Sequence, residues 1–131
     1  ATSLNPTAQG LLLDATEFLN ASELLLNRSA GVSLPTFFLL GRAIELSLKA
    51  YLLHTGCKAQ KLKRLGHDLT TLYQAANECG LPDYAKLEQL ELGALDLLSQ
   101  EYLSTRLVYR DTGGIYYLPK STLLKALLAD W

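Results

Sequence analysis

The sequence predicts an all-α fold, an up-and-down bundle of four to five helices, and three observations lead to this expectation. Leucine dominates the apolar residues while valine and isoleucine are few. Turn residues gather in a few places instead of recurring at the short spacing typical of strands. Several stretches repeat their apolar residues at intervals of three and four. With 131 residues the chain is long enough to bury a core, so we expect residues 1–131 to be a single domain.

The first expected helix runs from Asn5 to about Asn27. Asn5 is a suitable N-cap residue and Pro6 is favourable at the first helical position. Apolar residues then recur at helical spacing and form one continuous stripe, by which this helix is expected to pack. The stripe consists of Ala8, Leu11, Leu12, Ala15, Phe18, Leu19, Ser22, Leu25 and Leu26.

The second expected helix, from Ser33 to Gly56, is apolar nearly all the way round. Ser33 is its cap, and Gly56 is the terminating residue. Because this helix has little polar surface to show to water, we expect it to be the element against which the others pack. Gly41 within it indicates the close approach of another helix.

The stretch from Cys57 to Gly66 carries four positive charges and no negative ones, and we expect it to be a basic loop. A third helix follows from about His67 to Cys79 and is closed by Gly80. Asp68 lies where a carboxylate meets the unpaired amides at the start of this helix, so capping is a sufficient structural role for it.

A fourth helix is expected from Asp83 to Tyr102, with a break near Gly93. Its apolar residues at helical spacing are Tyr84, Leu87, Leu90, Ala94, Leu97, Leu98 and Tyr102. Residues 106–119 place β-branched and aromatic residues on both sides of a Gly-Gly turn, which is compatible with a short hairpin or a packed loop. We favour the loop slightly. A last helix is expected from about Ser121 to Asp130.

The net charge of −1 excludes a generally basic nucleic-acid-binding protein, although the charges are laid out unevenly. Six basic residues stand against Glu45 between positions 42 and 64, and seven acidic residues stand against Lys86 between positions 65 and 101. Such a basic segment could attract phosphate or dock against the acidic segment of a second copy. The alternative is two solvated surfaces that keep the helices soluble.

Cys57 and Cys79 are expected to be reduced thiols because they form neither a CxxC pair nor a zinc spacing, with a long-range disulfide as the alternative. The apolar runs are short and the first ten residues lack the pattern of a signal peptide. We therefore expect no membrane span and a cytoplasmic location. Two histidines without a carboxylate cluster predict no metal site, and no cofactor is expected.

Three charged residues share one face of the apolar central helix. At about 100° per residue, Arg42, Glu45 and Lys49 fall within roughly 60° of one another. This line is either the narrow solvated face of the helix or a partly buried polar site. Charge pairs three and four residues apart are common on ordinary helices, which supports the first interpretation. The basic stretch and His67, which follow closely, support the second.

The segment AIELSLKAYLLHTG followed by LGHDLTTLYQAANECG resembles the HEPN superfamily of small helical proteins. The shared features are an acidic residue and then a lysine on a core helix, a basic loop, and a Gly-His-Asp-Leu helix start followed by leucine and a small-residue pair. The later EYLSTRLVY is similar to the family's tyrosine and arginine near the end of the fourth helix. The resemblance spans about residues 43–109.

This resemblance implies a bundle of four or five helices that forms a homodimer and binds nucleotide or RNA at a polar cleft. It also implies a prokaryotic toxin–antitoxin or phage-defence type system, with a nucleotidyltransferase-type protein as partner. Many members of the family are metal-independent ribonucleases that use an arginine, four to six residues and then a histidine. This chain lacks that motif: His54 and His67 are its only histidines, and Arg64 is too close to His67. The absence counts against an enzyme of the usual type.

We therefore expect a nucleotide- or RNA-phosphate-binding domain, because arginine holds phosphate bidentately and histidine exchanges protons near neutral pH. Two alternatives remain. One is a dimeric protein-interaction module whose polar cluster is purely structural; the other is a metal-independent ribonuclease with a non-standard site, in which His67 is the candidate catalytic residue. The candidate ligand-binding residues are Arg42, Glu45, Lys49, Arg64, His67, Asp68, Arg106 and Tyr109.

Overall fold

The computed structural model of the protein describes residues 6–28 and 33–106, with side chains described as far as Ser104. These residues form five α-helices and one short 3-10 helix, and no strand occurs within them. The predicted all-α bundle is therefore confirmed for this part of the chain. The elements are α1 (Ala8–Arg28), α2 (Leu34–His54), α3 (Ala59–Leu65), α4 (Leu69–Glu78), η1 (Asp83–Ala85) and α5 (Gln89–Arg106).

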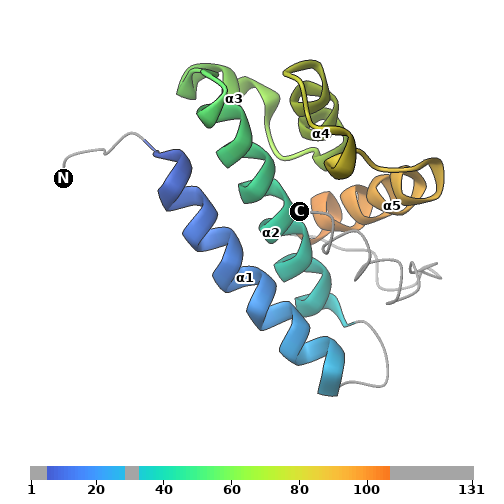
Figure 1. Ribbon diagram of the computed structural model, residues 1–131. Coiled ribbons are helices and arrows are strands. Elements are labelled where there is room, and N and C mark those ends of the chain that lie inside the picture. The colour runs from blue at the N-terminus through green and yellow to red at the C-terminus, as the bar shows by residue number, and fades with distance from the viewer. Residues whose placement is uncertain (1–5, 29–32, 107–131) are drawn as a thin grey trace.

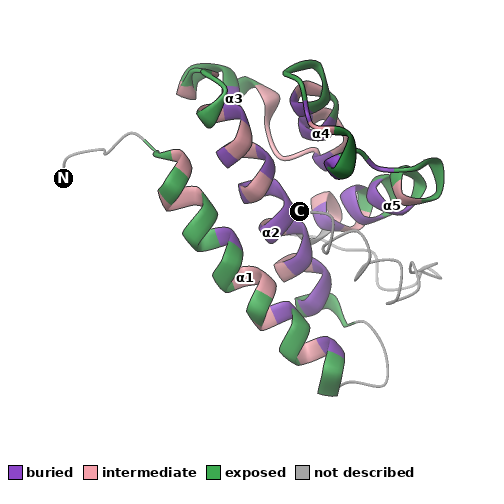
Figure 2. Ribbon diagram, viewed as in Figure 1, coloured by how far each residue is buried: buried purple, intermediate pink, exposed green. Residues whose placement is uncertain are grey.

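Helix α2 is the element around which the others are arranged. It runs antiparallel to α1, which covers one side of it, while α4 and α5 pack on its other side and on each other (Figure 1). Figure 2 shows that buried residues follow α2 along most of its length, whereas α1 is exposed on its outer side. The largest fully buried side chains of α2 are those of Phe37, Leu40, Ile44, Leu48 and Leu52. The prediction of a central apolar helix is thus correct.

The ends of α2 follow from local sequence. The Ser33 hydroxyl accepts a hydrogen bond from the backbone N–H of Thr36, and Pro35 lies in the first turn, where its missing N–H costs nothing. Thr55 is the C-cap, and Gly56 follows with φ of 102°, a left-handed conformation that glycine adopts without strain. Both ends therefore lie where the sequence predicts.

Gly41 allows α5 to approach α2 closely. A Cβ atom at Gly41 would lie 2.3 Å from Cδ1 of Tyr102, so the tyrosine ring occupies the space that any other residue would fill. The ring is fully buried and also packs against Phe38, with 5.9 Å between the ring centroids. The predicted role of this glycine is confirmed, and the approaching helix is α5.

Three predicted boundaries are wrong. Helix α1 begins at Ala8, because Thr7 accepts a hydrogen bond from the N–H of Gly10, while Asn5 lies outside the described residues. The basic stretch is not only a loop: its alanine, lysine, leucine and arginine residues favour helix and form α3, which Gly66 ends with φ of 74°. Helix α5 begins at Gln89 instead of Asp83, since Asp83–Ala85 forms only a short 3-10 turn.

The fourth predicted helix differs in two further respects. Gly93 lies inside α5 without a break, and Leu90, expected on the apolar face, is 70% exposed. Ala94, Leu98 and Tyr102 are buried as predicted, and Leu95 and Ser99 complete the buried face of α5. The loop or hairpin at 107–119 and the helix predicted at 121–130 lie outside the described residues.

Two further observations concern the described residues alone. None of their helices is both long enough and apolar enough to span a membrane. Cys57 and Cys79 are both free thiols, as predicted, so the alternative of a disulfide between them is excluded.

Leu48→Ala is expected to lower the free energy of unfolding by about 2–5 kcal/mol, because it would leave a cavity beside the most deeply buried side chains of α2. Leu90→Ala on α5 is the matched control, since Leu90 is 70% exposed and its truncation should change stability by less than about 0.5 kcal/mol. Chemical denaturation measures both. Equal losses for the two variants would contradict the central position of α2.

Candidate functional site

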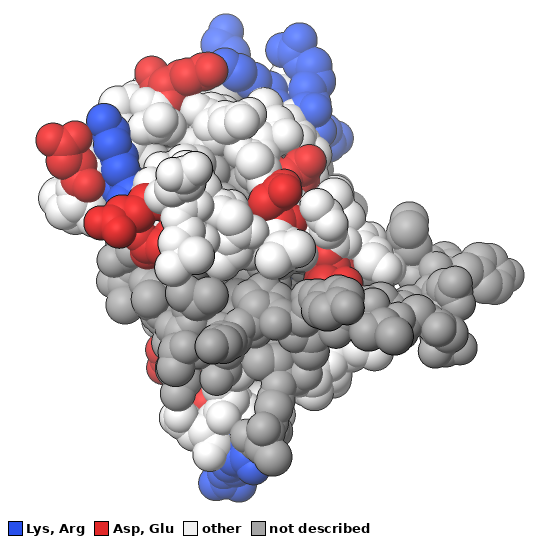
Figure 3. Space-filling view, turned by 90° about the vertical axis from the view of Figure 1, so that its right-hand side faces the viewer, with Lys and Arg blue, Asp and Glu red and all other residues white. Residues whose placement is uncertain are grey.

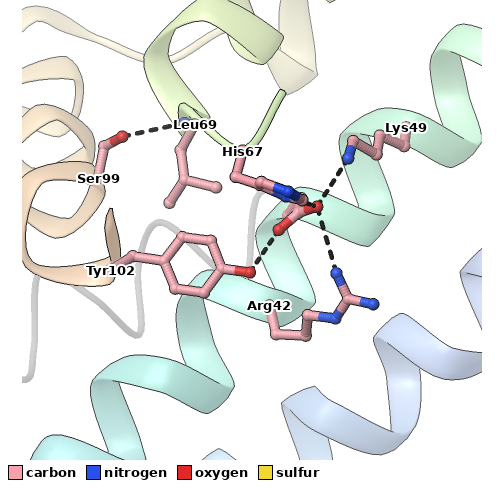
Figure 4. A network of polar contacts seen from close by, with 7 residues as sticks. Arg42, Lys49, His67, Leu69, Ser99 and Tyr102 are labelled. Carbon is pink, nitrogen blue, oxygen red and sulfur yellow. Dashed lines mark hydrogen bonds and ion pairs between the residues drawn. The ribbon is translucent and has the colours of Figure 1, made fainter. Parts of the chain in front are cut away.

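Glu45, in the middle of α2, is the centre of a polar cluster. Its side chain is only 1% exposed, yet both carboxylate oxygens are hydrogen-bonded (Figure 4). Oε2 accepts from Lys49 Nζ at 2.7 Å, from His67 Nδ1 at 2.8 Å and from Arg42 Nη1 at 3.2 Å. Oε1 accepts from the Tyr102 hydroxyl. The charge is therefore buried but fully compensated, as a buried carboxylate must be.

The four partners reach Glu45 from three parts of the chain. Arg42 and Lys49 precede and follow it by three and four residues on α2, so helix geometry alone places them on its face. His67 comes from the link between α3 and α4, and Tyr102 comes from α5. The carboxylate thus ties the central helix to two segments that lie 22 and 57 residues further along the chain.

Burial raises the pKa of Glu45, but the hydrogen bonds from Lys49, Tyr102 and His67 outweigh it and lower that pKa from 4.5 to about 2. Glu45 is therefore ionised at neutral pH and can only accept hydrogen bonds. It follows that Nδ1 of His67 carries a proton, so that in the neutral imidazole Nε2 is the basic nitrogen. The carboxylate thereby fixes both the orientation and the tautomer of this histidine.

Arg42 is also supported by α1. Its guanidinium carbon lies 5.9 Å from the centroid of the Phe18 ring, a distance at which a cation is attracted to the face of an aromatic ring. This contact holds the arginine on the side of α2 that faces α1, while Tyr102 closes the side that faces α5. The guanidinium therefore lies between Glu45 on α2 and Phe18 on α1.

Asp68 does not join the cluster, which corrects the prediction that groups it with Glu45. Its carboxylate accepts hydrogen bonds from the N–H groups of Thr70 and Thr71 and from the hydroxyl of Ser99. Ser99 in turn accepts from the N–H of Leu69 at 3.0 Å. The first three amides of α4 are thus satisfied, and Asp68 is a structural cap that also fastens α4 to α5.

Two consecutive residues of the α3–α4 link therefore form hydrogen bonds with two different helices. His67 bonds to Glu45 on α2, whereas Asp68 bonds to Ser99 on α5 (Figure 4 shows both His67 and Ser99). Ser99 and Tyr102 lie three residues apart on α5, so one face of this helix contacts both bonded systems. The Gly-His-Asp-Leu segment consequently fixes how α2, α4 and α5 sit against one another.

The other predicted ligand residues are not placed in the cluster. Arg64 is exposed on α3, and among the described residues it forms no hydrogen bond or ion pair. Arg106 is the last residue of α5, but its side chain lies outside the described part of the chain, as does Tyr109 altogether. The structure therefore brings together Arg42, Glu45, Lys49 and His67 from the predicted set.

Sequence reasoning missed Tyr102 and Phe18 as members of the site, because it assigned both to apolar stripes. A tyrosine on a buried face carries a hydroxyl that needs a partner, and this requirement was the available signal for Tyr102. No comparable signal exists for Phe18, whose role depends on how α1 sits against Arg42.

The cluster is open to solvent on its basic side. The side chains of His67, Arg42 and Lys49 are 42%, 32% and 14% exposed, whereas Glu45 is covered. Two fixed positive charges face one negative charge, which leaves one net positive charge before any protonation of His67. Within the described residues, Arg42 and Lys49 each donate to Glu45 alone, so both retain further N–H donors.

The surface charges continue this pattern. Basic side chains gather at the end of the molecule where α3 lies, and acidic side chains are spread over the side formed by α4 and α5 (Figure 3). The basic residues of the α3 region are Lys58, Lys61, Lys63 and Arg64, all exposed. Because α3 leads directly into His67, the approach to the cluster from this end is positively charged.

No group of three histidine, cysteine, aspartate or glutamate side chains suited to a metal ion occurs among the described residues. Comparison of the chain with protein-family models, with curated proteins and with solved structures finds no match. The resemblance to the HEPN superfamily therefore stays a prediction from the sequence.

Glu45→Gln is expected to lower the free energy of unfolding by about 3 kcal/mol at pH 7, because it leaves the cations around a buried position without their counter-charge. The pKa of Glu45 is lowered by folding, so its contribution is complete above about pH 4.5 and is lost as the pH falls towards about 2. The difference between the variant and the wild type should shrink over that window.

Glu88→Gln serves as the control, since Glu88 is exposed and its exchange should change stability by less than about 0.5 kcal/mol at pH 7. Urea denaturation at a series of pH values measures all three proteins. A constant difference between Glu45→Gln and the wild type from neutral pH to the acid limit would show that Glu45 titrates normally.

Proposed function

We propose that this chain is a HEPN-like domain that binds the phosphate groups of a nucleotide or RNA, in a prokaryotic toxin–antitoxin or phage-defence type system. The system and a nucleotidyltransferase-type partner rest on the sequence resemblance alone. The phosphate site rests on one observation: Arg42, Lys49 and His67 converge on a buried carboxylate and are themselves partly exposed.

The chemistry of this cluster suits an oxyanion. Within the described part of the chain, Arg42 keeps four of its five N–H donors and Lys49 two of its three after bonding to Glu45, and both retain their charge. Guanidinium and ammonium groups form charge-assisted hydrogen bonds with phosphate oxygens. Glu45 holds these groups in place before a ligand arrives, which lowers the conformational entropy that binding would otherwise lose.

Arg42→Gln is expected to weaken the binding of adenosine diphosphate or a short single-stranded RNA by about tenfold, because it removes a charged phosphate donor. Isothermal calorimetry at low salt measures the affinity, which should fall as salt is added. Lys86→Gln is the matched control, since Lys86 is an exposed basic residue whose ion pair in the described structure is with Asp83, away from Glu45. If the wild type binds neither compound, or both variants bind equally well, the proposal is wrong.

A ribonuclease with a non-standard site is a second candidate, favoured by the bond between Glu45 and His67. A carboxylate that accepts from one imidazole nitrogen orients the other as a proton acceptor, as in the carboxylate–histidine pairs of hydrolases. The two candidates are distinguished by incubating the protein with RNA in the presence of a metal chelator and examining whether the recovered RNA is intact. Fragments that disappear with His67→Ala would favour cleavage, and intact RNA favours binding alone.

The homodimer also remains a proposal, now with a surface to support it. The outer side of α1 carries Leu13 and Leu24, which are 66% and 60% exposed, and a second copy would remove them from water. Light scattering is expected to give twice the chain mass of 14.4 kDa at micromolar concentration. The Glu45 cluster can bind phosphate in either oligomeric state, so a monomer would contradict only the dimer.

A further inference from the structure

The two oxygens of Glu45 have different partners. Oε2 accepts hydrogen bonds from the three basic side chains, and Oε1 accepts one from the hydroxyl of Tyr102 (Figure 4). An arginine can bond both oxygens of a carboxylate at once, through two parallel N–H donors. Here Arg42 bonds only Oε2, because Oε1 faces Tyr102. The tyrosine therefore limits how many donors of Arg42 are used by Glu45.

The position of the Tyr102 ring does not depend on its hydroxyl. The ring lies in the space left by the missing Cβ of Gly41 and packs against Phe38, and no part of the residue is exposed. Close packing of this kind holds a phenylalanine ring equally well. Removal of the hydroxyl thus changes the bonding of Glu45 while leaving the packing between α2 and α5 in place.

We propose that Tyr102 is a positioning residue of the phosphate site, which keeps Glu45 turned so that Arg42 and Lys49 retain donors for a ligand. This inference rests on the proposed function. Without the hydroxyl, a buried carboxylate oxygen lacks a donor, which is unfavourable, and Arg42 is the partner that can supply one. Arg42 then bonds both oxygens of Glu45 and retains fewer N–H donors for phosphate.

Tyr102→Phe is expected to weaken the binding of inorganic pyrophosphate and of a short RNA by about tenfold, as one charge-assisted hydrogen bond is lost. Tyr73→Phe is the matched control: Tyr73 is also buried, and its hydroxyl accepts from the N–H of Leu87 at 2.9 Å, away from Glu45. It should lose stability without losing affinity. Calorimetry is done at a temperature at which all three proteins are folded.

A second measurement needs no ligand. The ¹⁵N NMR signals of the His67 imidazole report its bond to Glu45, so they should move in Tyr102→Phe and stay unchanged in Tyr73→Phe. Should Tyr102→Phe fail to fold, 3-fluorotyrosine at position 102 keeps the ring and hydroxyl but strengthens the donor. This replacement is then expected to shift the ¹⁵N signals of the His67 imidazole.

The outcomes separate the two proposals. If the wild type binds none of adenosine diphosphate, pyrophosphate and RNA, the proposed function is wrong and this inference fails with it. Binding by the wild type together with equal affinity of Tyr102→Phe would overturn only the positioning role. Unchanged His67 signals in the position-102 variant would overturn it as well, because Glu45 would then be oriented without the tyrosine.

Discussion

The carboxylate of Glu45 lies in the middle of an apolar helix, where an uncompensated charge would cost several kcal/mol. The fold meets this requirement by bringing Lys49, Arg42, His67 and Tyr102 to the two oxygens. Two of these partners come from the same helix at no cost in chain ordering beyond the helix itself. The other two arrive only when the later segments have docked, so this charge is satisfied in one arrangement of the helices.

Other features of the chain follow from the same constraint. Gly41 lacks a side chain where the Tyr102 ring must pass to reach Glu45. Asp68, next to His67, caps α4 and bonds to Ser99, which holds the link between α3 and α4 against α5. Apolar packing supplies most of the stability of such a bundle, but it is tolerant of small shifts between helices. The hydrogen bonds of Glu45 and Asp68 favour one relative position of the helices over the shifted ones.

The helices could be predicted where nearby residues in the sequence determine their ends and buried faces, and the site could be predicted in part. The apolar spacing and caps of α2 and α4 are local, as is the placement of Arg42, Glu45 and Lys49 on one face. The start of α5 was not predictable, because Asp83 is a suitable cap, whereas the N–H of Leu87 bonds to the distant Tyr73 hydroxyl and not to a helical carbonyl. Tyr102 reaches Glu45 across 57 residues, and no local pattern contains that contact.

The same groups satisfy the buried charge and present positive charge to solvent, which is why the cluster serves both as a structural tie and as the proposed phosphate site. Both roles require Glu45 to be ionised and bonded as described.

The most direct test is a ¹³C NMR titration of the Glu45 side-chain carboxyl in the folded protein. We expect a pKa of about 2 for this carboxyl, well below the ordinary 4.5. A pKa at or above 4.5 would contradict this expectation, because the carboxylate would then lack the donors on which the arrangement depends.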